Sequence, residues 1–366
     1  MSVPSASTPD LTTFYVYLTS GCNCACRHCY FVTNRTVQGD SGKALDPDCL
    51  RHAITQALPL GLRHLKWTGG EPTLHPAFRD FLHLQKEFGL AANLETNGLL
   101  VDDPLAELMM ACGVNQVSVS LDGARAETHD AIRGIQGGYE RTLRGIRALT
   151  SAGYAPEMIL TLQRENVTEL DDYLVLAADL GAGAVKFNIL QPFSGDTHLA
   201  EEGHVLRVTE LVELAHRLNV SADVKSTIPV SMDVPWAFRP LSKIVSGDRD
   251  GRCNILHILG ILPNGEYALC GVGQHLSELA MGTIMASGLA EVWGNHPVLV
   301  SLRKGLPGDL QGVCGDCLMK GSCRGSCVAN NYQAGADLFA PHWFCQQAVE
   351  AGIFPTTRLV KKVDKL

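Results

Sequence analysis

The first 224 residues contain apolar and polar positions in patterns that predict strands and helices in turn. Residues 13–19 (TFYVYLT) alternate larger apolar side chains with smaller ones, as a strand with one buried face does. Further strands are predicted at residues 64–67, in the stretch ending at 95, and at 116–120, 158–163 and 184–189. The predicted helices cover residues 47–58, 77–88, 105–112, 139–152, 170–180 and 207–218.

Six strands alternating with helices predict an α/β fold with a parallel sheet and right-handed crossovers. A doubly wound sheet and a barrel both fit, and in either one ligands gather at the carboxyl ends of the strands. Residues 225–252 carry three prolines and the polar stretch SGDRDGR, which predicts a connecting segment. The residues beyond show little regular period, so metal would have to replace a hydrophobic core there.

Composition narrows the class of protein. A chain of 366 residues with 46% hydrophobic and 19% charged residues is expected to fold, and the net charge of −8 argues against a nucleic-acid partner. The N-terminus shows no signal-peptide pattern, and no stretch reaches the roughly 18 apolar residues of a membrane span. We therefore predict a cytoplasmic protein without a membrane partner.

Thirteen cysteines are the most informative residues. Four lie between Cys22 and Cys29, seven between Cys253 and Cys345, and Cys49 and Cys112 are isolated. Such thiol density in a cytosolic chain favours bound metal over disulfides. Two thiol-rich regions flanking a thiol-poor body predict two domains.

Cys22, Cys26 and Cys29 form the spacing C-x3-C-x2-C directly after the first predicted strand. Three thiolates can hold three irons of a 4Fe–4S cluster and leave the fourth iron open to an external molecule. Zinc bound by three cysteines and water is the alternative, and Cys24 would permit a four-cysteine site. The spacing alone leaves iron–sulfur and zinc open.

Three further motifs follow predicted strands in order: TGGEP at 68–72, ETNG at 95–98 and SVSLDG at 118–123. A fourth, HDxxRG at 129–134, comes next in the chain. With the cysteine triplet they resemble the signature of the radical S-adenosylmethionine (SAM) superfamily. The resemblance implies a partial (β/α)6 barrel like that of TIM barrels. It also implies that SAM chelates the open iron and is reductively cleaved to a 5′-deoxyadenosyl radical, which removes a hydrogen atom from a substrate.

The same resemblance implies the SAM contacts. The glycines let the backbone approach SAM, and Glu71 helps to hold its amino group. Arg133 would pair with the carboxylate of SAM, and His28 would touch the adenine. The other expected contacts are Gly69, Gly70, Glu71, Asn97 and Ser120. We expect Asp122 and His129 to hold their own loops, and Cys24 to be a spectator.

The C-terminal cysteines follow the spacing C-x11-G-x4-C from Cys253 to Cys270, then C-x2-C-x5-C-x3-C from Cys314 to Cys327, with Cys345 beyond. The C-x2-C pair alone would suggest a zinc ribbon. The full pattern is similar to the SPASM domain, which carries auxiliary iron–sulfur clusters in peptide-modifying radical SAM enzymes. This resemblance implies two ligand sets: Cys314, Cys317, Cys323 and Cys345 for an outer cluster, and Cys253, Cys270 and Cys327 for an inner one.

The expected organisation is an N-terminal tail (1–12), a radical SAM core (13–224), a connecting segment (225–252), a small, irregular SPASM domain (253–350) and a C-terminal tail (351–366). The inner cluster lacks a fourth cysteine. Either it keeps an open iron, which would suit bond formation to a substrate, or another group completes it. His257 is a candidate, although a histidine between Leu256 and Ile258 is more often packed.

Family members mature sulfatases, crosslink ribosomal peptides or oxidise small molecules. Sulfatase maturases place an aspartate after the cysteine that matches Cys270, whereas this chain has Gly271, so that activity is less favoured. We predict oxidative modification or crosslinking of a ribosomally made peptide. The alternatives are a radical SAM dehydrogenase or epimerase of a sugar, aminocyclitol or cofactor precursor, and a zinc-stabilised binding module without activity.

The implied cofactors are SAM and three iron–sulfur clusters, and the implied partners are the substrate and a reductant such as flavodoxin or ferredoxin. About a dozen residues precede the first strand, too few for a leader-binding module, so a separate protein would deliver a peptide. No catalytic acid or base is evident. Side chains that could line the cavity are Tyr30, Gln163, Asn188, Gln191 and Lys186.

Overall fold

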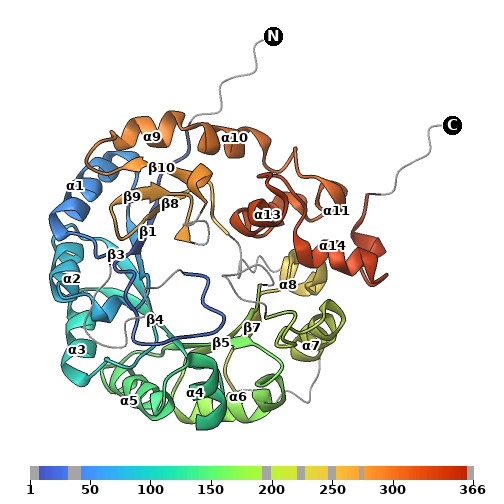
Figure 1. Ribbon diagram of the computed structural model, residues 1–366, viewed down its shortest axis with the longest axis horizontal. Coiled ribbons are helices and arrows are strands. Elements are labelled where there is room, and N and C mark those ends of the chain that lie inside the picture. The colour runs from blue at the N-terminus through green and yellow to red at the C-terminus, as the bar shows by residue number, and fades with distance from the viewer. Residues whose placement is uncertain are drawn as a thin grey trace.

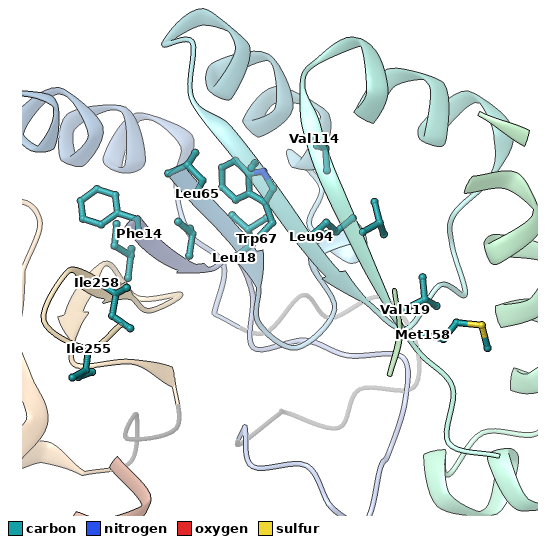
Figure 2. Packing of buried hydrophobic residues seen from close by; sticks show 14 of the residues in the cluster. Phe14, Leu18, Leu65, Trp67, Leu94, Val114, Val119, Met158, Ile255 and Ile258 are labelled. Carbon is teal, nitrogen blue, oxygen red and sulfur yellow. The ribbon is translucent and has the colours of Figure 1, made fainter. Parts of the chain in front are cut away.

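The strands form because every second side chain can be buried under a layer of helices. In β1 (Thr13–Tyr17), Phe14 and Val16 are fully buried against the helices, while Thr13 and Tyr15 line a cavity on the other face of the sheet. The same alternation repeats in β2 (His64–Thr68), where Leu65 faces the helices. Figure 2 shows such apolar side chains between the strands and the outer helices.

The computed structural model describes residues 8–31, 43–191, 199–220, 227–245, 253–271 and 276–360. The remaining strands are β3 (Ala91–Thr96), β4 (Val114–Ser120), β5 (Glu157–Leu162), β6 (Ala184–Ile189), β7 (Val230–Met232), β8 (Ile258–Ile261), β9 (Glu266–Ala268) and β10 (Ala280–Thr283). The polar stretch 246–252, which the sequence assigns to a connecting segment, lies outside the described residues.

The helices lie outside the curved sheet (Figure 1). In the predicted core they are α1 (Pro47–Ala57), α2 (Phe78–Glu87), α3 (Asp103–Ala111), α4 (Ala126–Arg133), α5 (Gly138–Ser151), α6 (Leu170–Asp179) and α7 (Val208–Val220). Further along the chain follow α8 (Leu241–Val245), α9 (Leu289–Asn295), α10 (Pro297–Gly305), α11 (Gly312–Gly315), α12 (Lys320–Cys323), α13 (Val328–Gly335) and α14 (Trp343–Glu350).

One sheet runs through the described chain in the order β10-β9-β8-β1-β2-β3-β4-β5-β6-β7. The strands from β1 to β8 that neighbour one another in this order pair in parallel, while β9 pairs antiparallel with both β8 and β10. The α/β fold with a partial barrel is therefore confirmed. β7 continues the sheet beyond residue 224, into the stretch expected to be only a connection.

The expectation of little regular structure after residue 253 is wrong. Three strands there extend the main sheet, and Leu289, Trp293 and Phe344 are buried in the same hydrophobic core as Phe14. Apolar packing, and not metal alone, therefore holds this region. The C-terminal region joins the barrel where β8 pairs with β1.

Candidate active site

The loop after β1 carries Cys22, Cys26 and Cys29 and is tied to the turn after β2 by backbone hydrogen bonds. The N–H of Gly70 donates to the carbonyl of Thr19 at 2.7 Å, and that of Glu71 donates to the carbonyl of Gly21 at 2.9 Å. A Cβ atom at Gly70 would lie only 2.1 Å from the Gly21 oxygen. The glycine pair is therefore required for this close approach of two loops, whatever it does for SAM.

The other side of the cysteine loop is held by the segment that contains Arg133. The N–H of Ala25 donates to the Arg133 carbonyl at 2.9 Å, and Arg133 Nη1 donates to Cys26 Sγ at 3.5 Å. Arg133 Nε also pairs with Asp122 Oδ2 at 2.6 Å, and both side chains are buried. Hydrogen bonding from Cys24, together with the charges of Arg133 and His28, lowers the pKa of Cys26 to about 5. Cys26 is therefore poised as a thiolate, the form that binds iron.

Cys24 lies among the predicted ligands instead of apart from them. Its buried thiol contacts those of Cys22 and Cys26 and accepts a hydrogen bond from Asn97 Nδ2 at 3.5 Å. Asn97 Nδ2 also donates to Asn23 Oδ1 at 2.7 Å. The ETNG turn is therefore in contact with the cysteine loop, and the spectator role of Cys24 stays a prediction.

Glu71 is engaged mainly by protein groups. Its carboxylate accepts hydrogen bonds from Thr73 Oγ1 and Thr96 Oγ1, both at 2.6 Å, and from the N–H of Asn97 at 2.7 Å. Burial raises the pKa of this carboxyl group, and these donors oppose the rise. Glu71 thus holds the ETNG turn in place, and direct contact with SAM stays a prediction.

His28 lies against β5 and the SLDG loop. Its Nδ1 contacts Gln163 Nε2 at 3.1 Å, and its Nε2 is 3.6 Å from Asp122 Oδ2. Asp122 Oδ1 accepts the N–H of Thr161 at 2.7 Å, and His129 Nδ1 accepts the N–H of Asp122 at 3.1 Å. Asp122 and His129 thus make the loop-holding contacts expected of them.

Ser120, another predicted SAM contact, ends β4 and is partly buried. It pairs in the sheet with Ile159 of β5, beside the loop that carries Asp122. Its role toward SAM stays a prediction.

The barrel encloses a polar cavity of about 530 Å³. Lys66 Nζ pairs with Glu95 Oε1 at 2.6 Å, and Lys186 Nζ pairs with Asp233 Oδ2 at 3.4 Å along its wall. Burial alone would raise the pKa of Glu95, but the Lys66 ammonium outweighs burial and lowers it. Because Lys186 also lines this cavity, its side chain points into the barrel, as its place on the strand suggested.

Sequence reasoning missed Lys66, Glu95 and Asp233 as cavity residues. The available signal was a single charged side chain in the alternating pattern of each of two strands, Lys66 in LKW and Glu95 in LET. Of the other predicted cavity residues, Gln191 Oε1 accepts the indole N–H of Trp343 at 2.7 Å, and Asn188 Oδ1 is buried without a hydrogen-bond partner in the described chain. Tyr30 is half-buried, and burial together with the charge of Glu95 raises the pKa of its hydroxyl.

The inner-cluster cysteines come from separate elements. Cys253 precedes β8, Cys270 follows β9, and Cys327 is the N-cap of α13. Burial and the charge of Cys270 raise the pKa of Cys253 to about 12. Burial, together with the charges of Cys270 and Cys253, also raises the pKa of Cys327. Each of these thiols therefore lies within electrostatic range of another, and their binding of one shared cluster stays a prediction. His257 Nδ1 contacts the Asp10 carbonyl at 3.0 Å, so this nitrogen has a protein partner.

The four predicted outer-cluster cysteines line one cavity: Cys314, Cys317, Cys323 and Cys345. The N–H groups of His342 and Met319 donate to Cys314 Sγ and Cys317 Sγ, each at 3.3 Å. Such N–H···S bonds stabilise thiolates, and a hydrogen bond from Cys345 helps to lower the pKa of Cys314 to about 7. The donor set fits an iron–sulfur cluster. Across the described residues, no three His, Cys, Asp or Glu side chains converge as a single bound ion would require.

Comparison with known proteins agrees with this geometry. The sequence profile of the radical SAM superfamily matches residues 16–177. The chain is 30% identical to the AdoMet-dependent heme synthase of Methanosarcina barkeri, covering 90% of this chain and 94% of that protein. It is 27% identical to the mycofactocin maturase MftC of Mycobacterium tuberculosis, covering 90% and 81%. The chain belongs to the radical SAM superfamily.

Solved structures agree in fold. SuiB of Streptococcus suis, bound to its precursor peptide SuiA, superposes with a TM-score of 0.71 at 13% identity, covering 93% of this chain and 76% of SuiB. anSMEcpe with bound AdoMet gives 0.70 at 16% identity, covering 93% and 95%. The chain is a radical SAM enzyme related to a peptide maturase, and its C-terminal cysteine pattern fits the SPASM domain. The prediction of an enzyme is confirmed, which sets the zinc-stabilised binding module aside. No helix in the described ranges has the length and apolar character to cross a membrane.

Proposed function

We propose that this enzyme oxidatively modifies or crosslinks a ribosomally made peptide inside the barrel cavity. The observation that carries this proposal is a polar cavity inside the barrel, lined among others by Tyr15, Lys66 and Glu95. Tyr15 lines this cavity, and the charges of Cys253 and Cys270 help to raise its pKa. Tyr30 follows Cys29 in the chain, and the charge of Glu95 on the cavity wall helps to raise the pKa of Tyr30. A substrate there would lie between the radical source and an electron acceptor.

The residues would divide the work as follows. Cys22, Cys26 and Cys29 hold the cluster that binds SAM, which when bound supplies a 5′-deoxyadenosyl radical. The positive charge of Arg133 lies beside Cys26. The ion pair of Lys66 and Glu95 makes the cavity wall polar. Fixed charges on this wall would orient a polar substrate.

The auxiliary sites would hold the other two clusters. Cys253, Cys270 and Cys327 would bind the inner one and Cys314, Cys317, Cys323 and Cys345 the outer one. Gly69, Gly70, Glu71, Asn97, Ser120 and His28 would surround SAM. A cytoplasmic reductant such as flavodoxin or ferredoxin would supply the electron.

A second candidate is oxidation of a small cofactor precursor. The relationship to a heme synthase favours it, since that relative is 30% identical along nearly its whole length. The charged pairs of the cavity would suit a small polar substrate as well as a peptide.

Mass spectrometry tests these two candidates. Short peptides encoded beside the gene are incubated with reconstituted enzyme, SAM and reductant, in parallel with a carboxylated porphyrin. Loss of two hydrogen atoms from a peptide, absent with Cys29→Ala, would support the peptide function. Change of the porphyrin alone would contradict it and support the second candidate.

A further inference from the structure

Tyr17, the last residue of β1, contacts the loop that carries the SAM-cluster thiols. Its buried ring stacks on Phe31 with centroids 5.3 Å apart and planes inclined by 8°. Phe31 lies two residues after Cys29, and the Cys29 thiol donates to the Phe31 carbonyl at 3.2 Å. The ring therefore packs directly against the end of the cysteine loop.

The other end of Tyr17 reaches the inner auxiliary site. Its hydroxyl oxygen accepts the N–H of Gly271 at 2.9 Å, and Gly271 follows Cys270. A Cβ atom at position 271 would lie 1.9 Å from Tyr17 Cζ and 2.2 Å from the hydroxyl oxygen. The phenol thus fills the room that any side chain at position 271 would need.

The phenol remains protonated in this setting. Burial raises the pKa of Tyr17 well above its ordinary value, and the nearby Tyr30 and Cys270 add to the rise. Because the hydroxyl oxygen takes the Gly271 N–H, that donor is withheld from sulfur atoms at Cys270. Hydrogen bonds to cluster sulfurs stabilise the reduced state and raise the reduction potential.

We propose that Tyr17 is a positioning residue that joins the cysteine loop to the inner auxiliary site and keeps the potential of the inner cluster low. It does so through the stack on Phe31 and the hydrogen bond to Gly271. The inference rests on the inner cluster assigned under the proposed function. It also explains why position 271 is glycine, since an ionisable side chain there would displace Tyr17.

Tyr17→Phe keeps the ring and removes the hydroxyl. Redox titration monitored by electron paramagnetic resonance should show an upward shift of the inner-cluster potential and no shift for the SAM cluster. Tyr267→Phe is the matched control, because Tyr267 is also fully buried, lies three residues before Cys270 in the chain, and has a hydroxyl with no hydrogen-bond partner in the described residues. An unchanged or lowered potential in Tyr17→Phe, or an equal shift in Tyr267→Phe, would overturn the proposal.

A second experiment tests whether the Tyr17 ring occupies the space that a side chain at position 271 would need. Gly271→Ala should lose the irons of the inner cluster, and Tyr17→Ala combined with Gly271→Ala should recover them. Full iron in Gly271→Ala, or no recovery in the double variant, would contradict the role of Tyr17. A wild-type enzyme without an inner-cluster signal would instead overturn the cluster assignment, and this inference with it.

Discussion

At the scale of single residues, the site depends on two kinds of close contact that only certain residues permit. Glycine is needed where loops meet, since Gly70 lies against the Gly21 carbonyl. A buried ion pair is needed beside the thiols, where Asp122 holds Arg133 next to Cys26. Each of these contacts leads to a prediction.

Gly70→Ala should displace the cysteine loop, because the new Cβ would overlap the Gly21 carbonyl. We expect loss of the SAM-cluster irons and of SAM cleavage, measured on anaerobically purified protein. Gly294→Ala is the control, because position 294 lies in α9 with no atom close to the new Cβ. It should keep its iron and gain about 0.5–1 kcal/mol of stability. Unchanged iron in Gly70→Ala would refute the steric argument.

Asp122→Asn should leave the buried charge of Arg133 unpaired and cost about 3–5 kcal/mol. Burial would raise the pKa of Asp122, but Arg133 and His28 outweigh it and lower the pKa. The ionised carboxylate therefore stabilises the fold at neutral pH. Its contribution is lost as the pH falls below about 4 and through the lowered folded-state pKa.

Thermal unfolding at several pH values measures this difference between wild type and Asp122→Asn. The difference in stability between the two proteins should be largest at neutral pH and should become smaller in acid. Asp172→Asn is the control, because Asp172 pairs with Arg125 at 3.2 Å on an exposed surface. It should cost under about 1 kcal/mol. Equal effects of the two variants would contradict the role of the buried pair.

At the scale of elements, β8 determines whether the C-terminal region belongs to the barrel. Its residues Ile258–Ile261 are all buried, and they pair in parallel with β1. The auxiliary cysteines Cys253 and Cys270 flank the β8–β9 hairpin. The pairing of β8 with β1 therefore places the inner site against the barrel.

The variant Leu259→Ala tests whether the barrel and the C-terminal region unfold as one cooperative unit. Leu259 is fully buried in β8, so its truncation should cost about 2–5 kcal/mol. Because the sheet is continuous, calorimetry should show one unfolding transition at a lower temperature. Val175→Ala on α6, where Val175 is 59% exposed, should change stability by less than about 0.5 kcal/mol. A separate early transition for the C-terminal region would contradict a single cooperative unit.

The elements also show how far sequence reasoning reaches. The six core strands were predictable because one face packs on helices and the period is clear. β8 and β9 were not, because ILGI is buried on both faces and shows no alternation, and β9 has only three residues. The cysteine groups followed from spacing and family resemblance. The pairing of Lys66 with Glu95 did not, because it depends on the neighbouring positions of β2 and β3 in the sheet.

At the scale of the whole molecule, three groups of thiols lie around one barrel. Cys22, Cys26 and Cys29 lie on the loop after β1. Of the inner cysteines, Cys253 and Cys270 flank the β8–β9 hairpin and Cys327 caps α13, while the outer ones line a cavity of their own. The polar cavity of the barrel is lined by Tyr15, whose pKa is raised in part by the charges of Cys253 and Cys270. This arrangement suits hydrogen removal from a substrate followed by electron removal.

The most direct test is the iron and acid-labile sulfide content per chain after anaerobic reconstitution. Three clusters predict about ten or more irons with matching sulfide. Cys29→Ala, Cys270→Ala and Cys317→Ala should each lose the irons of one cluster, and only Cys29→Ala should abolish reductive cleavage of SAM outright. About three zinc ions without sulfide, or irons for a single cluster in the wild type, would contradict the account.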